Sequence, residues 1–282
     1  MINFNLFYNE LIKVLFKRRT YISFILITFL IPLIVYGFEY GAVSLEDKIS
    51  NQMQDIVVTA GSAVNGYLAA YIIISILISQ MSFLSTIVPS EIISGEYSKG
   101  TFRIYLTRPI SRSSLFLSKV LVVLLYTTLM MVYFFTYTIL VSYLILDKGM
   151  LIVFHDGIVG LDPVNDNVLY RFFLGFMLSN FIMITVSFLC LMFSSFSKNS
   201  VTPIISTISI VFIGAAILFI PIDIFEAINP YIFTGYMNIF LKAFYEPIPY
   251  ELFYDCLYVC STWSLLFLSI AYYNFIRRDI LE

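Results

Sequence analysis

The stretch VLVVLLYTTLMMVYFFTYTILVSYLIL, residues 120–146, runs for 27 residues without a charged side chain. A helix of about 20 mostly apolar residues, rising about 1.5 Å per residue, crosses the hydrocarbon core of a bilayer. A membrane-spanning strand would need only about ten residues of alternating polarity, which this stretch does not show. Since the backbone polar groups inside lipid must be satisfied internally, the stretch predicts a transmembrane helix.

Five further charge-free stretches extend this pattern along the chain, at residues 20–38, 56–90, 172–197, 199–222 and 256–276. Of the 282 residues, 60% are hydrophobic and 12% are charged, whereas about a quarter are charged in soluble domains. We therefore predict an all-α membrane protein, one transmembrane domain over residues 1–282. Its six transmembrane helices are expected at about residues 20–40, 64–88, 117–146, 171–196, 201–222 and 255–276.

The distribution of cations predicts the orientation. If both termini are cytoplasmic, only four of the 16 Lys and Arg residues fall outside, namely Lys48, Lys148, Arg171 and Lys242. This excess of inner cations follows the positive-inside rule. The first charge-free stretch follows Lys17-Arg18-Arg19 but lacks a small-residue cleavage site, so we interpret it as a retained signal anchor.

Residues 1–19 are predicted to form an amphipathic helix in the inner interface of the membrane. Asn5, Asn9, Lys13 and Lys17 recur at fourfold spacing, and Phe4, Phe7, Leu11, Val14 and Leu15 fall on the other side. Cations near anionic headgroups and Phe side chains among acyl chains suit such a helix. The alternative is a cytoplasmic extension of the first span.

Residues 89–114 form a polar, basic cytoplasmic loop between two long apolar stretches. Pro89 and Gly100 bracket a short helical piece that carries Glu91 and Glu96. A second short helix with an apolar side at Phe102, Tyr105 and Leu106 is expected to end at Pro109. Ser111 can cap the next span by accepting a hydrogen bond from a free amide. A loop of this kind would pass a push from a soluble domain to both spans.

The pattern Gly95-Glu96-x-x-x-Gly100-Thr101 followed by Leu106-Thr107-x-Pro109-x-Ser111-Arg112 resembles the cytoplasmic loop of ABC-2 type transporter permeases. In that family the loop is a coupling helix that docks on a separate ATPase subunit. The resemblance assigns Glu96, Gly100, Thr101, Leu106, Pro109 and Arg112 to this coupling element, and Glu91 and Arg103 are its charged neighbours. The interfacial start, the six spans and the basic C-terminal tail are similar to the family as well. The alternative is an ordinary basic connection that serves topology alone.

Catalytic and cofactor motifs are missing from the sequence. Gly95-x-x-x-x-Gly100-Thr101 lacks the Lys of a nucleotide-binding loop and follows a membrane helix rather than a strand. We therefore expect no ATP hydrolysis by the chain itself, no catalytic residue and no cofactor, with ATP bound by the partner subunit. The single His and the absence of a Gly-x-Ser-x-Gly motif argue against a membrane enzyme. The three Cys residues lie in or beside spans, where apolar packing is expected.

Few polar residues lie within the predicted spans. Gln80 and Asn180 are costly to leave facing lipid, so they are expected to face other helices or a pathway. No Asp, Glu, Lys or Arg is expected near the centre of the bilayer, which argues against an ion-driven relay and suggests an apolar or amphiphilic substrate.

Two outer segments complete the chain. Residues 147–170 contain His155, Asp156, Asp162 and Asp166, whose spacing matches no calcium loop, so a solvated turn-rich loop is favoured over a metal site.

Residues 223–254 are rich in aromatic residues, among them Phe233, Tyr236, Phe240 and Phe244. Such residues predict an aromatic belt at the outer interface. Similar permeases carry short, partly re-entrant helices here, which would cap the pathway.

Together these patterns predict the permease subunit of an ATP-driven ABC transporter, and the resemblance favours an exporter. Its expected partners are two ABC ATPase subunits, a second permease copy or a sister permease, and the lipid bilayer, without nucleic acid. The expected location is a prokaryotic plasma membrane. The alternative is an ATPase-coupled membrane module that signals mechanically or assembles an envelope complex without transporting cargo.

Overall fold

The computed structural model describes residues 4–50, 65–98, 100, 111–146, 149, 151–154, 158–161, 167–220 and 222–277. Within them, six helical segments are long and apolar enough to cross a membrane. The predicted all-α membrane fold with six spanning helices is therefore confirmed.

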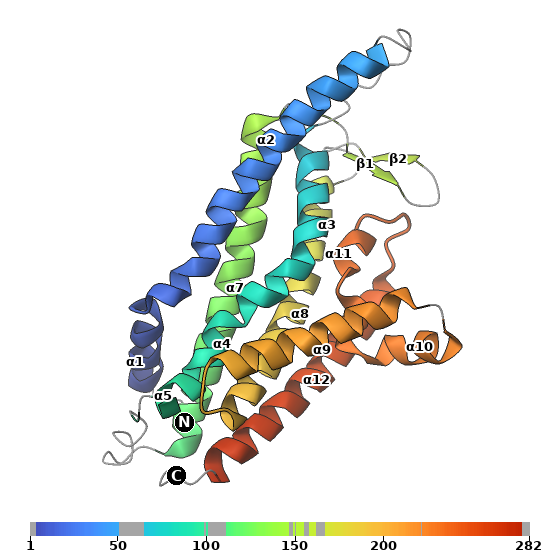
Figure 1. Ribbon diagram of the computed structural model, residues 1–282. Coiled ribbons are helices and arrows are strands. Elements are labelled where there is room, and N and C mark those ends of the chain that lie inside the picture. The colour runs from blue at the N-terminus through green and yellow to red at the C-terminus, as the bar shows by residue number, and fades with distance from the viewer. Residues whose placement is uncertain are drawn as a thin grey trace.

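The spanning helices are α2 (Ile22–Ser50), α3 (Gly66–Ser85), α7 (Arg112–Ile145), α8 (Val168–Phe196), α9 (Val201–Phe219) and α12 (Tyr250–Arg277). The apolar segment that contains α3 continues into the short helix α4 (Ile87–Ile92). Helices α7 and α8 bury most of their residues and form the centre of the bundle. Helices α2 and α9 lie at its margins, and only 22% of the residues in the apolar stretch of each are buried (Figure 1).

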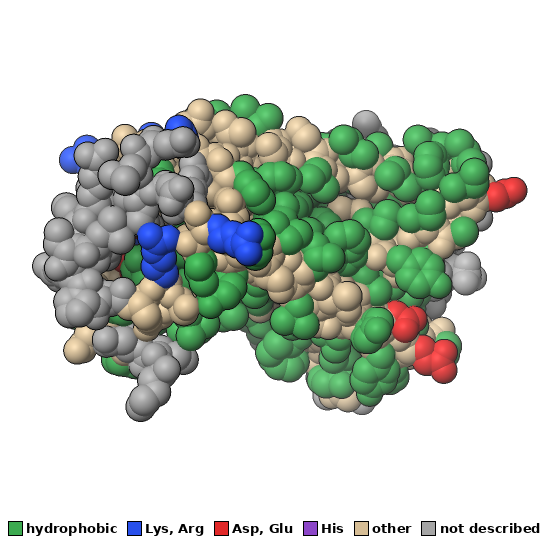
Figure 2. Space-filling model, turned by 90° about the horizontal axis from the view of Figure 1, so that it is seen from below, with side chains coloured by type: hydrophobic (Ala, Val, Ile, Leu, Met, Phe, Trp, Pro, Cys, Tyr) green, Lys and Arg blue, Asp and Glu red, His purple; other side chains and the backbone are tan. Residues whose placement is uncertain are grey.

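One end of the bundle, here called the α1 end, gathers the short elements near the N-terminus. It contains α1 (Phe4–Leu15), the 3-10 helix η1 (Arg18–Tyr21) and α5 (Ser94–Ser98), and α12 also ends there (Figure 1). Figure 2 shows Lys and Arg side chains toward one end of the face that it displays, Asp and Glu toward the other, and hydrophobic side chains between them. Such a separation of charge at the two ends of an apolar surface suits a membrane-spanning bundle.

Helix α1 ends at Leu15, before the predicted residue 19, and one of its sides faces the protein. Phe4 and Leu15 are exposed, whereas Leu6, Glu10 and Val14 face the protein and are buried. The reason is that α1 packs against α7, where Lys119 is the charged partner of Glu10. Periodicity alone marks this side of α1 as apolar.

The opposite end of the bundle, here called the far end, begins with a small hairpin. Strand β1 (Leu151–Phe154) pairs antiparallel with β2 (Ile158–Leu161) in the register Leu151 to Leu161. The expectation of a solvated turn-rich loop is wrong here, because Leu151, Val153 and Leu161 are buried. His155, Asp156, Asp162 and Asp166 lie outside the described residues. Among the residues that are described, no group of three or more His, Cys, Asp or Glu could hold a metal ion.

The far end also holds the segment between α9 and α12, which contains α10 (Asp223–Ile228), η3 (Asn229–Tyr231), η4 (Phe233–Tyr236) and α11 (Ile239–Lys242). The predicted aromatic belt at the outer interface describes only some of the aromatic residues of this segment. Phe233, Tyr236, Phe240 and Phe244 are buried in the bundle, whereas Tyr231 is exposed. Phe233, Phe240 and Phe244 are buried because their rings pack against aromatic residues of the spanning helices.

Phe240 shows how α11 is held in the bundle. Its ring centroid lies 5.7 Å from that of Phe135 on α7, 6.1 Å from that of Phe172 on α8 and 6.0 Å from that of Tyr71 on α3. Gly175 on α8 makes room for this ring, since a Cβ there would lie 2.6 Å from Cδ2 of Phe240. The missing side chain of Gly175 thus allows α11 to approach α8.

Gly175→Ala is therefore expected to lower the free energy of unfolding by about 1–3 kcal/mol, because the added methyl group overpacks the site of Phe240. The check is the unfolding midpoint of the purified protein in mild detergent. Gly37→Ala in α2 is the matched control, since nothing lies within 4 Å of a Cβ built at Gly37. Equal midpoints for the two variants would contradict the close packing of α11 on α8.

Candidate coupling site

The predicted coupling residue Glu96 lies at the α1 end, in α5, and belongs to a cluster of four charged side chains. Nζ of Lys119 on α7 lies 2.7 Å from Oε2 of Glu96 and 2.8 Å from Oε2 of Glu10 on α1. Nζ of Lys13 lies 2.5 Å from Oε1 of Glu10 and 3.1 Å from Oε1 of Glu96. Each carboxylate thus binds both lysines, and the four side chains close a ring. We call Glu10, Lys13, Glu96 and Lys119 the charge ring.

The charge ring is buried except on one side. Lys119 is fully buried, Glu10 is 2% exposed, and only the Lys13 side chain is substantially open, at 41%. Lys119 uses its third donor on the carbonyl oxygen of Ile92, 3.0 Å away. Two positive and two negative charges balance, which is the condition under which buried charges are tolerated.

The environment of Glu10 has two opposing effects on its pKa. Desolvation by burial raises the pKa of the Glu10 carboxyl, but the charge and hydrogen bonds of Lys119 and Lys13 outweigh it. The pKa of Glu10 is therefore lowered below its ordinary value. Glu10 is expected to remain ionised in the folded protein at neutral pH.

This lowered pKa predicts how stability depends on pH. Because the folded protein holds the Glu10 proton less tightly than the unfolded chain, the contribution of Glu10 is fully present above the unfolded pKa, about 4.5. It should be lost as the pH falls from there through the folded pKa. The check is the unfolding midpoint of wild type and Glu10→Gln from pH 7 to 3. The difference between them should shrink below about pH 4.5, and a constant difference would contradict the ion pairing.

Glu91 makes a second ionic link between the loop region and the N-terminal segment. Arg19 Nη1, in η1, donates to Glu91 Oε1, and Nζ of Lys17 lies 3.8 Å from Oε2 of Glu91. Both cations are partly exposed, so this link should contribute less than the charge ring. It nevertheless attaches α4 to the turn that leads into α2.

Side chains of α8 bind the backbone where α3 passes into α4. Ser187 Oγ donates to the carbonyl oxygen of Ser85 at 3.4 Å, and Cys190 Sγ to that of Thr86 at 3.5 Å. Pro89 has no amide hydrogen, so the carbonyl of Ser85 lacks its usual helical donor. The hydroxyl of Ser187 supplies a replacement, which holds the kinked segment against α8.

The break between α4 and α5 has a similar cause. The amide of Ser94 donates to Ser194 Oγ at 3.1 Å, and Ser194 Oγ donates to the carbonyl oxygen of Ser90 at 2.9 Å. The hydroxyl of Ser194 on α8 thus stands between a donor and an acceptor that would bond directly in a continuous helix. A side chain inserted in this way interrupts a helix. The single bracketed helical piece of the prediction is therefore two short helices separated by Ile93.

Two further coupling candidates are described. Gly100 has φ of 66°, and its amide donates to the carbonyl of Tyr97 at 3.1 Å. This left-handed conformation after a helix end favours glycine.

Arg112 donates through Nη1 to the carbonyl of Ile276 at 2.6 Å, which joins the start of α7 to the end of α12. Ser111 caps α7 as predicted, since its side chain accepts from the amide of Ser114. Thr101, Arg103, Leu106 and Pro109 lie outside the described residues.

The two polar residues within the spans lie apart from this site. Gln80 is exposed at the edge of an apolar groove of about 250 Å³ between α2, α3 and α7, beside Leu26, Ile31 and Phe134. Asn180 is half-buried in α8, and its Oδ1 is buried without a hydrogen-bond partner among the described residues.

Sequence reasoning did not find two members of the charge ring. Neither Glu10 nor Lys119 is among the coupling residues that the resemblance assigns. Two features distinguish Glu10 and Lys119 from the other charged residues. Glu10 stands four residues from both Leu6 and Val14 on the buried side of α1, and Lys119 is the only charged residue between Arg112 and Asp147. A charge isolated in an apolar stretch needs a partner, and here the partners come from two other elements.

This arrangement can transmit a mechanical load. The short helices α4 and α5 contact α7 through Lys119, α8 through Ser194 and the N-terminal segment through Glu10 and Glu91. A displacement of α5 would therefore act on several spanning helices together.

Comparison with known protein families shows to which family the chain belongs. Residues 6–216 match the family model described as ABC-2 family transporter protein. No curated protein matches the chain. The match covers most of α1, the charge ring, the first four spanning helices and most of α9. The chain therefore belongs to the ABC-2 transporter family and is a multi-pass membrane permease component of an ABC transporter.

Proposed function

We propose that residues 89–114 couple this permease to an ABC ATPase subunit and that the assembly exports its substrate. The family implies a partnership with such an ATPase. The observation that carries the proposal is the charge ring, because it joins α5 at the start of this loop to α1 and α7 by buried ion pairs. Glu91, Glu96, Gly100 and Arg112 are the described candidates for coupling, and Thr101, Arg103, Leu106 and Pro109 are the others.

The proposed mechanism begins when ATP closes two ATPase subunits against each other. Their movement would press on the coupling loop at the α1 end. Because Lys119 and Ser194 attach this region to α7 and α8, the central helices would move with it. Access to a cavity between two permease copies, or between this chain and a sister permease, would then change from one side of the membrane to the other.

The chain itself is proposed to bind no nucleotide, so ATP is bound and hydrolysed in the partner. Both termini would face the cytoplasm, which places the α1 end inside and the far end outside. The proposed location is a prokaryotic plasma membrane.

The apolar groove beside Gln80 supports an amphiphilic substrate. Its lining is apolar apart from Gln80, which can bind one polar group by hydrogen bonds. An acyl or other apolar chain would lie along Leu26 and Leu77, within the apolar part of the groove. Asn180 is the second candidate position on the pathway.

The test is to purify the tagged chain from its own membranes in mild detergent and to identify bound proteins by mass spectrometry. We expect a stoichiometric partner that carries Gly-x-x-x-x-Gly-Lys-Ser/Thr. Reconstitution of the pair in vesicles should then show ATP-dependent movement of an amphiphilic cargo. Purification of the chain alone under several mild conditions would count against coupling. ATP hydrolysis without any cargo movement would favour a mechanical membrane module instead.

A further inference from the structure

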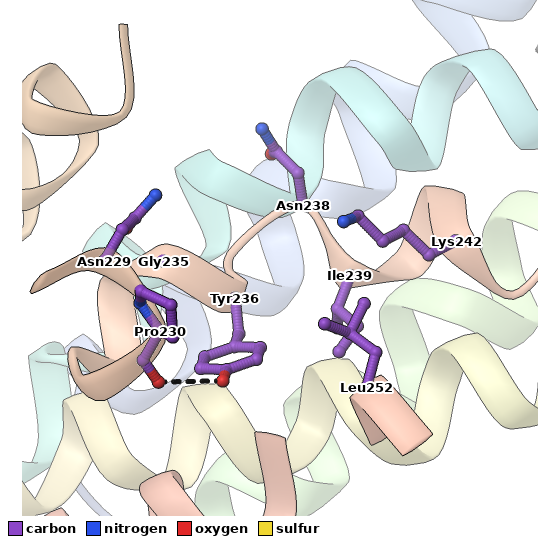
Figure 3. A pocket seen from close by; sticks show the side chains of 8 residues that line it. All are labelled: Asn229, Pro230, Gly235, Tyr236, Asn238, Ile239, Lys242 and Leu252. Carbon is purple, nitrogen blue, oxygen red and sulfur yellow. Dashed lines mark hydrogen bonds between the residues drawn. The ribbon is translucent and has the colours of Figure 1, made fainter. Parts of the chain in front are cut away.

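The segment between α9 and α12 and the start of α12 line an open cavity of about 280 Å³, here called the far-end cavity (Figure 3). Its polar lining includes Asn229, Asn238, Tyr236 and Lys242, and Ile239 and Leu252 form an apolar wall. The cavity lies away from the charge ring and from the groove beside Gln80, since none of these residues belongs to either. Its size suits a headgroup or another small polar molecule.

The side chains that line this cavity include several hydrogen-bond donors. The Tyr236 hydroxyl donates to the carbonyl oxygen of Pro230 at 2.8 Å, so the phenol is used within the wall. The ammonium group of Lys242 and the amide groups of Asn229 and Asn238 are the remaining side-chain donors. In Figure 3 the Lys242 side chain extends over Ile239, on the side where the Asn238 amide also lies. Among the residues that the structure describes, no Asp or Glu lines the cavity.

The ion pairing of the two described far-end cations points to an anion beside Lys242. Among the far-end cations whose side chains are described, Arg171 binds Glu246, with Nη2 2.6 Å from Oε1. Lys242 makes no ion pair with a described residue. A half-buried ammonium among neutral amides is compensated best by an anionic group that accepts several hydrogen bonds.

We propose that the far-end cavity binds a phosphate ester. Its anionic oxygens would accept hydrogen bonds from Lys242 and from the amides of Asn229 and Asn238. The carbon chain attached to the ester would lie against Ile239 and Leu252. The phosphate could belong to a lipid headgroup of the surrounding bilayer or to a soluble phosphate compound. This binding requires neither ATP nor the coupling loop.

The test uses the delipidated permease in complex with its ATPase partner, studied by native mass spectrometry. Phosphatidylglycerol, diacylglycerol with the same acyl chains, and inorganic phosphate are titrated separately. We expect one site that prefers phosphatidylglycerol to diacylglycerol. Lys242→Gln and Asn238→Asp should each weaken this site by about tenfold, because one removes the ammonium group and the other adds a repelling carboxylate.

The matched control is Lys198→Gln, which removes an exposed lysine just beyond the end of α8, at the α1 end. It should leave phosphatidylglycerol binding unchanged. Competition by inorganic phosphate would show that the site accepts soluble phosphate, and binding of the lipid without such competition would assign it to headgroups. The proposal is overturned if both far-end variants bind phosphatidylglycerol as the wild type does, or if diacylglycerol binds equally well.

Discussion

Lys119→Met is expected to lower the free energy of unfolding by about 3–5 kcal/mol, which is the usual cost of removing one partner from a buried ion pair. Lys119 is fully buried and donates to Glu10, Glu96 and the carbonyl of Ile92. Methionine fills a similar volume but donates no hydrogen bond, so Glu10 would keep its charge with only Lys13 to compensate it. The measurement is the denaturant or thermal unfolding midpoint of the purified complex in mild detergent.

A second substitution separates the loss of charge balance from the loss of packing. In Lys119→Met combined with Glu10→Gln, the uncompensated charge on α1 is removed, so part of the lost stability should return. Lys198→Met is the matched control, since this exposed lysine has no place in the charge ring. A loss below about 0.5 kcal/mol for Lys119→Met, the range of ordinary surface substitutions, would show that the charge ring does not hold α1 and α5 to α7.

Glu96→Gln is expected to uncouple transport from ATP hydrolysis. The substitution keeps the shape of the side chain but removes the charge that Lys13 and Lys119 share. A charge-assisted hydrogen bond contributes about 1.5–3 kcal/mol and tenfold corresponds to about 1.4 kcal/mol, so transport should fall at least about tenfold. Insertion and ATP hydrolysis by the partner should continue. The measurement compares the rates of both processes in the same vesicles.

Two further variants decide whether an effect of Glu96→Gln arises from coupling. Glu251→Gln, an exposed residue at the start of α12 on the far end, is the control and should leave both rates unchanged. Gly100→Pro lies outside the charge ring, but proline cannot adopt the φ of 66° and cannot donate to Tyr97. It should reduce transport as well. Normal coupled rates in both Glu96→Gln and Gly100→Pro would remove the loop from the mechanism.

The parts of the fold that depend on local composition could be predicted. A charge-free stretch such as residues 120–146 spans a membrane because of its own length and hydrophobicity. Ser111 caps α7 by accepting a hydrogen bond from the amide of Ser114, only three residues away. The coupling residues Glu91, Glu96 and Gly100 could be proposed because they stand in or beside a recognisable pattern, and their role stays a prediction. Their partners could not be derived, since Glu10 and Lys119 are separated by 109 positions and meet only when α1 packs on α7.

The burial of the far-end aromatic residues could not be predicted for the same reason, because it depends on how the helices pack. Aromatic residues such as Phe240 and Tyr231 look alike in the sequence, and both suit a membrane interface. Only Phe240 faces a gap beside Gly175 on α8, so it is buried while Tyr231 remains exposed.

The sequence by itself determined that this protein spans a membrane six times, which region connects the second and third spans, and which family the connecting motif resembles. These features follow from hydrophobicity and spacing along one segment. The tertiary structure decided that the connecting region is bound to α1 and α7 by buried ion pairs and to α8 by serine hydroxyls. A buried charge and a freed carbonyl each require a partner, and which partner is within reach depends on how the helices pack.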